Sequence, residues 1–188
     1  MKITLRLAVC TASLFVAFPL LAQNNSDHSG HDSDGNSAGH RQDAPHGFGG
    51  NVVLSTPAQT AAVSNAVASV TSALRSGSLT TSSGAIIPAA AQANTYAVMT
   101  SDAAQAISAA RLSAALSTAG SDASEIVPAL VSGFSALPSN PVGLPTVVAT
   151  YNNFTKAASA SFIAKPPAEF LALRAVLAQL TAAAVSAK

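Results

Sequence analysis

The stretch from Pro167 to Val185 carries the sequence pattern that most constrains the fold. Five of its apolar residues follow one another at alternating steps of three and four, which places them along one side of an α-helix. These residues are Phe170, Leu173, Leu177, Leu180 and Ala184. Pro167 suits a first helical turn, and Glu169 would lie at the positive end of the helix dipole. Such a helix needs partner helices to cover its apolar side.

Two further helices are predicted in the first half of the chain. One begins at Thr56-Pro57, with Thr56 as N-cap, and ends at Gly77. Its buried side is formed by Val63, Val67, Val70 and Leu74. A weaker pattern predicts the other helix over 88–99, after a polar loop at 76–87.

A helix over 102–118 is predicted to end at Gly120. The residues expected on its buried face are Ala103, Ile107, Ala110 and Ala114, flanked by Leu112 and Leu116. The next helix starts at Ser121 or Asp122, where Glu125 would complete a capping box. Its apolar residues are Ile126, Leu130 and Phe134, and Pro128 among them requires a later start or a kink.

The last helix before the C-terminal one is predicted over about 145–162. Its expected buried residues are Val147, Tyr151, Phe154, Ala158 and Phe162. Lys165-Pro166-Pro167 ends it. Residues 51–188 are therefore expected to form one all-α domain, an alanine-rich bundle of about five to six helices.

The first 22 residues have the pattern of a secretory signal peptide. Lys2 and Arg6 precede a mostly apolar run that ends at Ala22. The alternative is an uncleaved membrane anchor, but Pro19 and the short apolar run disfavour it. No later segment is expected to span a membrane, so we expect an exported protein of the periplasm or the extracellular space. Cleavage would remove Cys10, the only cysteine, and leave no disulfide chemistry.

Residues 23–50 are polar and contain almost no apolar side chain except Phe48. Such a composition cannot bury enough apolar surface to offset the entropy of ordering the chain. We therefore expect a disordered tail that ends in the flexible sequence Gly47-Phe48-Gly49-Gly50.

Residues 51–188 carry only ten charged side chains, six basic and four acidic. This is about 7%, far below the roughly 25% of ordinary domains. Because the basic residues form no stripe along the sequence, nucleic acid is not expected as a partner.

The tail contains all four histidines, interleaved with aspartates. Imidazole and carboxylate groups are ligands for Zn²⁺, Cu²⁺ or Ni²⁺. The candidate ligands of a weak, adaptable metal site are His28, His31, Asp32, Asp34, His40 and His46. The alternative is a solvated linker that happens to carry histidines, and the lack of supporting groups in a disordered tail favours it.

The segment from Asp32 to Asn36 resembles the opening of an EF-hand calcium loop, and Asp43 occupies the twelfth position. The resemblance then fails, because Ser37 stands where the loop requires glycine and neither flank is predicted to be helical. Calcium binding is therefore not expected.

Residues 51–188 contain no histidine and no cysteine, so Ser-His and Cys-His catalysis would require the tail. Ser161 precedes Lys165 by four residues rather than the three of Ser-x-x-Lys, and a lysine at a helix end is usually solvated. Tyr96 and Tyr151 lie on apolar helical faces, where packing in the core is the usual role. The protein is therefore not expected to be an enzyme, and no cofactor is expected beyond weakly bound metal.

These features predict an exported, non-catalytic structural or interaction module that associates with itself or with an envelope protein. The alternative is an envelope metal-handling protein that uses the histidine-rich tail. A third alternative is a carrier of an apolar ligand, which requires a cavity between the helices.

Overall fold

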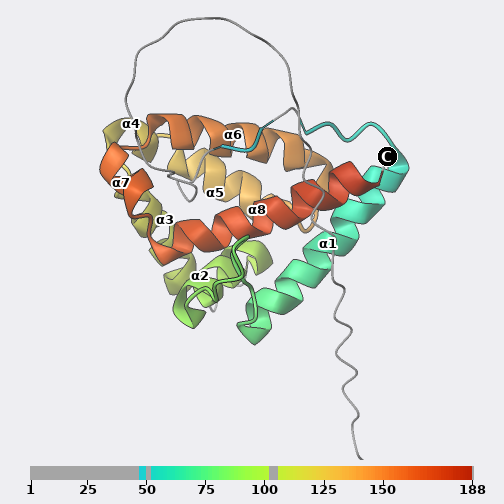
Figure 1. Cartoon of the computed structure of the whole chain (residues 1–188), viewed down its shortest axis with the longest axis horizontal. Helices are drawn as coiled ribbons and strands as arrows, with labels where there is room; N and C mark the ends of the chain where they lie inside the picture. Colours follow the sequence, from blue (N-terminus) through green and yellow to red (C-terminus); the bar gives the residue numbers. More distant parts are fainter. Residues whose placement is uncertain (1–46, 50–51, 102–105, 188) are drawn as a thin grey trace, which may run out of the picture. The chain divides into compact units, whose positions relative to one another are not determined.

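Helix α8 (Ala168–Ser186) lies at the centre of the helices in the computed structural model, which describes residues 47–49, 52–101 and 106–187 (Figure 1). It contacts α1, α2, α3 and α6. The predicted all-α architecture is confirmed, and among the described residues the only β pairing is an isolated bridge between Thr80 and Ile86. The predicted signal peptide and residues 23–46 of the predicted tail lie outside the described residues.

All five residues of the predicted seam of α8 are buried. The buried surface also extends beyond the seam, to Ala172, Ala175 and Val176. Pro167 is the N-cap rather than part of the first turn. Among the described helices, α8 is the one long and apolar enough to span a membrane by length and composition, with a mean hydropathy of 1.5. In this fold its apolar side chains form the core.

Helix α1 (Pro57–Ser76) has the predicted ends and the predicted buried side. The Thr56 hydroxyl accepts from the Gln59 N–H, and the Gln59 side chain accepts from the Thr56 N–H, which completes a capping box. At the other end Gly77 adopts a left-handed conformation with φ of 69°. The local sequence therefore determines both ends of α1.

Helices α2 (Ala89–Thr100) and α3 (Ala106–Ser117) lie side by side, and the predicted buried face of α3 is wrong. Ile107 is 74% exposed, and Ala110 and Ala114 are also exposed, whereas Leu112 and Leu116 are buried. Two leucines bury more apolar area than two alanines, so the helix turns its leucines to the core. Ala103 lies outside the described residues.

The single helix predicted from Ser121 is divided into α4 (Ser121–Ser124) and α5 (Val127–Ala136). Pro128 lies in the first turn of α5, where its missing N–H costs no hydrogen bond. The predicted capping box of Asp122 and Glu125 is wrong, because the N-cap of α4 is Gly120 and no side chain caps it. After α5, a short 3₁₀ helix, η2 (Pro141–Gly143), leads into α6.

The helix predicted over 145–162 is also divided, into α6 (Leu144–Ala157) and α7 (Ala160–Ala164). Ser159 separates them: its hydroxyl accepts from the Phe162 N–H as the N-cap of α7. Its own N–H donates to the Ala119 carbonyl at 2.7 Å. Helix α6 therefore ends before Ser159, because this serine caps the next helix and its N–H is bonded to the loop at Ala119.

Candidate functional site

The predicted metal ligands, His28, His31, Asp32, Asp34, His40 and His46, all lie outside the described residues. Within 47–49, 52–101 and 106–187, no group of three or more His, Cys, Asp or Glu side chains is placed to hold a metal ion. The candidate sites that the structure does describe are two hollows and one aromatic cluster.

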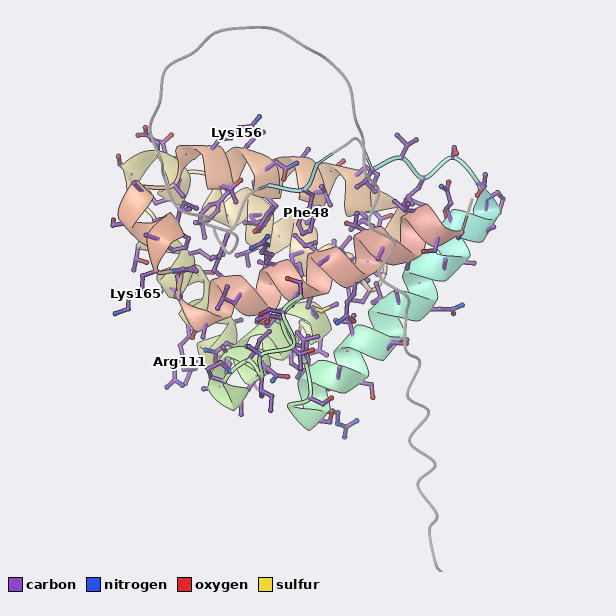
Figure 2. All side chains as sticks on the ribbon, viewed as in Figure 1. Phe48, Arg111, Lys156 and Lys165 are labelled. Carbon is purple, nitrogen blue, oxygen red and sulfur yellow. The ribbon has the colours of Figure 1, made fainter. Side chains whose placement is uncertain are left out.

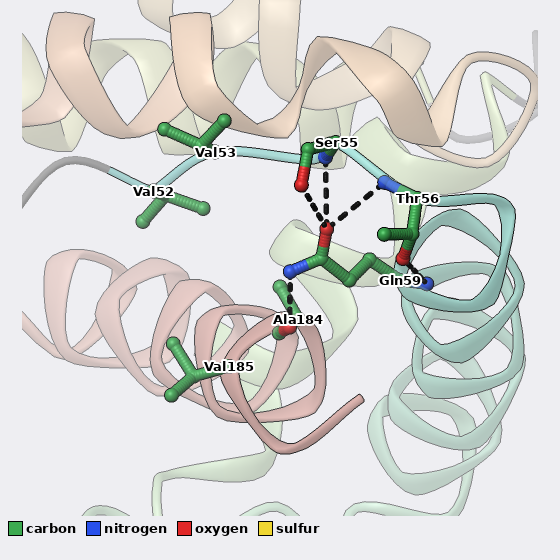
Figure 3. A pocket seen from close by; sticks show the side chains of 7 residues that line it. All are labelled: Val52, Val53, Ser55, Thr56, Gln59, Ala184 and Val185. Atoms are coloured by element: carbon green, nitrogen blue, oxygen red, sulfur yellow. Dashed lines mark hydrogen bonds between the residues drawn. The ribbon is translucent and has the colours of Figure 1, made fainter. Parts of the chain in front are cut away.

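The larger hollow, of about 480 Å³, lies between the segment that leads into α1 and the C-terminal end of α8 (Figure 3). Its walls are mostly apolar, and Val53 and Val185 are 60% and 53% exposed. It is lined by Val52, Val53, Ser55, Thr56, Gln59, Ala184 and Val185. None of these side chains is charged, so the hollow, which we call the Val53–Val185 groove, favours contact with an apolar surface.

Gln59 supplies the polar floor of this groove, and its carboxamide already has several partners (Figure 3). Oε1 accepts from the Ser55 N–H at 2.8 Å, the Thr56 N–H at 3.1 Å and the Ser55 hydroxyl at 3.2 Å. Nε2 donates to the Ala184 carbonyl at 3.3 Å. The buried amide therefore joins the start of α1 to the end of α8, and its role is structural.

The smaller hollow, of about 130 Å³, lies between the loop after α1 and the middle of α8. It is lined by Phe48, Thr81, Ser82, Leu171, Arg174, Ala175 and Ala178. Arg174, on α8, is half-buried. Its guanidinium is the one cationic group of this lining.

Aromatic rings from α6, α7 and α8 form a connected cluster beside this hollow. Tyr151 stacks on Phe170 with ring centroids 5.4 Å apart, and Phe154 and Phe162 contact Phe170 at 5.7 Å and 5.2 Å. These are distances at which aromatic pairs attract beyond their simple burial. The predicted core role of Tyr151 is confirmed, since its side chain is fully buried.

The Tyr151 hydroxyl is buried and has no hydrogen-bond partner among the described residues. Burial raises the pKa of this hydroxyl well above its ordinary value of 10.0, and the positive charge of Arg174 opposes that shift only in part. The phenol is therefore held in its neutral form, and a base or nucleophile is not available at this position.

Phe48 lies over this cluster, between α6 and α8 (Figure 2). Its ring centroid is 5.1 Å from that of Tyr151. The side chain of Asn152 holds its backbone: Oδ1 accepts from the Phe48 N–H at 2.7 Å, and Nδ2 donates to the Phe48 carbonyl at 3.1 Å. The sequence places Phe48 in the tail, whereas in the structure Phe48 is bonded to Asn152 and packs on Tyr151.

Among the charged side chains that the structure describes, Arg174 is the one that lines either of the two hollows. Arg111, Lys156 and Lys165 are exposed on separate elements and point outward (Figure 2). Glu169 accepts from Asn94 Nδ2 at 3.1 Å, which joins α8 to α2. Ser161, the residue considered with Lys165 for catalysis, instead shares a hydrogen bond of 3.1 Å with the Ser159 hydroxyl.

Sequence reasoning missed the buried carboxamides Gln59, Gln92 and Asn94 and the clamp formed by Asn152. Glutamine and asparagine are usually surface residues, so no pattern distinguishes the ones that tie backbone segments together. The capping-box spacing of Thr56 and Gln59 was the one available signal. Comparisons with protein-family models, with curated proteins and with solved structures found no match.

Proposed function

We propose that this protein is an exported, non-catalytic helical module that associates with a second copy of itself through the Val53–Val185 groove. The observation that supports this most directly is the pair of exposed valines on an uncharged, mostly apolar hollow. Exposed apolar surface of this kind commonly marks a contact between proteins.

A second copy is the occupant that the chemistry of the domain favours. Few charges are present in residues 51–188, so two copies approach with little like-charge repulsion. A symmetric dimer brings the same patch of both copies together, and an uncharged apolar groove is compatible with such self-contact.

The test is the oligomeric state of the processed protein as a function of concentration, measured by sedimentation or light scattering. We expect wild type to form dimers as concentration rises, and Val185→Asp to remain monomeric. Ile107→Asp is the matched control, because Ile107 is also apolar and exposed but lies on α3. A wild type that stays strictly monomeric would contradict the proposal, and so would equal loss in both variants.

A second candidate function is weak binding of transition metals by the tail. It is supported by the position of the four histidines, all of which precede Gly47. Titration of Cu²⁺ or Zn²⁺ into wild type and into a variant with all four histidines replaced by asparagine tests it. Loss of binding in the variant supports this function, and equal binding contradicts it.

A further inference from the structure

The side-chain amide of Asn152 holds the backbone of Phe48 by two hydrogen bonds. One carboxamide group accepts from the N–H and donates to the carbonyl of the same residue. Both hydrogen bonds are made to the backbone of Phe48, so they do not depend on its side chain. They would hold any segment that presents its main chain in the same way.

Side-chain recognition comes from the ring of Tyr151 beneath Phe48. The two rings meet at 46° with centroids 5.1 Å apart, and Tyr151 is backed by Phe170. The Tyr151 ring is fully buried and stacked on that of Phe170. An aromatic residue is favoured over an aliphatic one at this position, because two rings at this separation attract each other beyond their simple burial.

The position before the aromatic residue requires glycine. A Cβ atom on Gly47 would lie 2.6 Å from Asn152 Oδ1 and 3.1 Å from its Cγ. These distances are so short that the Asn152 side chain would have to move. A Cβ atom on Gly49 would have no heavy atom within 4 Å. The recognised sequence is thus glycine followed by an aromatic residue, with room for at least a Cβ atom at the third position.

We infer that Tyr151, Asn152 and the adjoining face of α8 form a docking site for a peptide segment with a Gly–aromatic sequence, occupied here by the chain's own Gly47–Phe48–Gly49. This segment acts as an intramolecular latch. It does not rest on the self-association proposed above, because the two surfaces use different residues.

The latch competes more strongly for the site than a separate peptide does, because it belongs to the same chain. Only two residues join Gly49 to the described segment that begins at Val52, so the effective concentration of the latch is on the order of millimolar or higher. A separate peptide therefore binds measurably only when the latch has been removed from the site.

The test uses a peptide with the sequence of residues 45–50, Pro-His-Gly-Phe-Gly-Gly, titrated calorimetrically into the processed full chain. We expect the Phe48→Ala variant to bind this peptide at least about tenfold more tightly than wild type. The peptide with alanine at its first glycine should not bind. The double variant Phe48→Ala/Asn152→Ala should lose binding, whereas Phe48→Ala/Asn153→Ala, altered at the exposed neighbouring asparagine, should retain it.

A second variant that empties the site keeps the test decisive if Phe48→Ala fails to fold. Gly47→Ala retains phenylalanine at position 48, but its Cβ atom would clash with Asn152 and displace the segment from the site, so this variant should also bind the peptide. Failure of both folded variants to bind would overturn the inference. Equal binding of the two peptides, or binding that survives Asn152→Ala, would also overturn it. A Phe48 contact that weakens on dilution of wild type would show exchange between copies and refute the intramolecular latch.

Discussion

Gln92 holds both backbone polar groups of Leu79 with its single carboxamide. Oε1 accepts from the Leu79 N–H at 2.9 Å, and Nε2 donates to the Leu79 carbonyl at 3.2 Å. The same Nε2 contacts the carbonyls of Gly77 at 3.0 Å and Ile87 at 2.7 Å. The Gln92 side chain is fully buried, so the loop between α1 and α2 folds around it.

Replacing Gln92 with leucine should therefore destabilise the protein strongly. The change preserves most of the volume but leaves a buried N–H without its partner, and such groups cost about 1–3 kcal/mol each. We expect a loss of about 2–4 kcal/mol in the free energy of unfolding, measured by urea denaturation. Gln179→Leu, at an exposed position of α8, is the control and should change it by less than about 0.5 kcal/mol.

Tyr151→Phe should leave the stability at neutral pH unchanged or raise it by up to about 1 kcal/mol. The reason is that the buried hydroxyl has no hydrogen-bond partner in the part of the chain that the structure describes, so its removal eliminates a desolvated polar group without breaking a hydrogen bond there. Urea denaturation near pH 7 measures this. A loss of more than about 2 kcal/mol would mean that the hydroxyl has a partner.

The same variant should change the response to alkaline pH. Because burial raises the pKa of Tyr151 in the folded state, the unfolded state loses its proton first, above its ordinary value of 10.0. Stability is therefore fully present below that pH and falls as pH rises towards the folded-state pKa, by up to about 1.4 kcal/mol per unit for one group. Tyr151→Phe should lack this part of the decline, so the two stability curves should separate above pH 10.0 and run parallel below it.

Asn152→Ala should loosen Phe48 without unfolding the helices. Two hydrogen bonds are lost, which corresponds to about 1–2 kcal/mol, and the backbone around Phe48 becomes easier to detach. Limited digestion with chymotrypsin, which cleaves after aromatic residues, should cut at Phe48 faster in this variant than in wild type. Asn153→Ala, at the next position on the exposed side of α6, should digest like wild type.

Gly133→Ala should show energetic coupling to Val147. A Cβ atom at position 133 would lie 3.1 Å from Val147 Cγ2, so the close contact between α5 and α6 opposes the helix-propensity gain of about 1 kcal/mol. In the Val147→Ala background the crowding is removed, and Gly133→Ala should become more favourable by at least about 0.5 kcal/mol. Equal effects in the two backgrounds, measured by urea denaturation, would show that the contact imposes no constraint.

The elements that sequence reasoning identified correctly are those with large apolar residues and clear end signals. Helix α8 shows a 3–4 spacing of phenylalanine and leucine, and α1 has a threonine cap and a terminal glycine. In both cases local preference and tertiary burial favour the same structure. Such agreement makes an element predictable.

The prediction was wrong where alanine dominates the pattern. On α3 the alanines and Ile107 also follow a helical spacing, but Leu112 and Leu116 contribute more on burial and determine the face. The breaks at Glu125–Ile126 and Ala158–Ser159 separate short helices whose ends are set partly by neighbouring elements, as the bond from Ser159 to Ala119 shows. Contacts of this kind depend on residues far away in the sequence and leave no local signal.

The groove lined by Val53 and Val185 also bears on the connectivity of the fold. Because the Gln59 amide bonds to the Ala184 carbonyl, the segment that enters the helices and the segment that leaves them adjoin (Figure 3). A short glycine linker from the end of α8 to Val52 would join them, and new termini could be opened between the exposed Pro138 and Ser139. Such a circular permutant would retain every contact between helices, because the fold depends on which helices adjoin and not on where the chain starts.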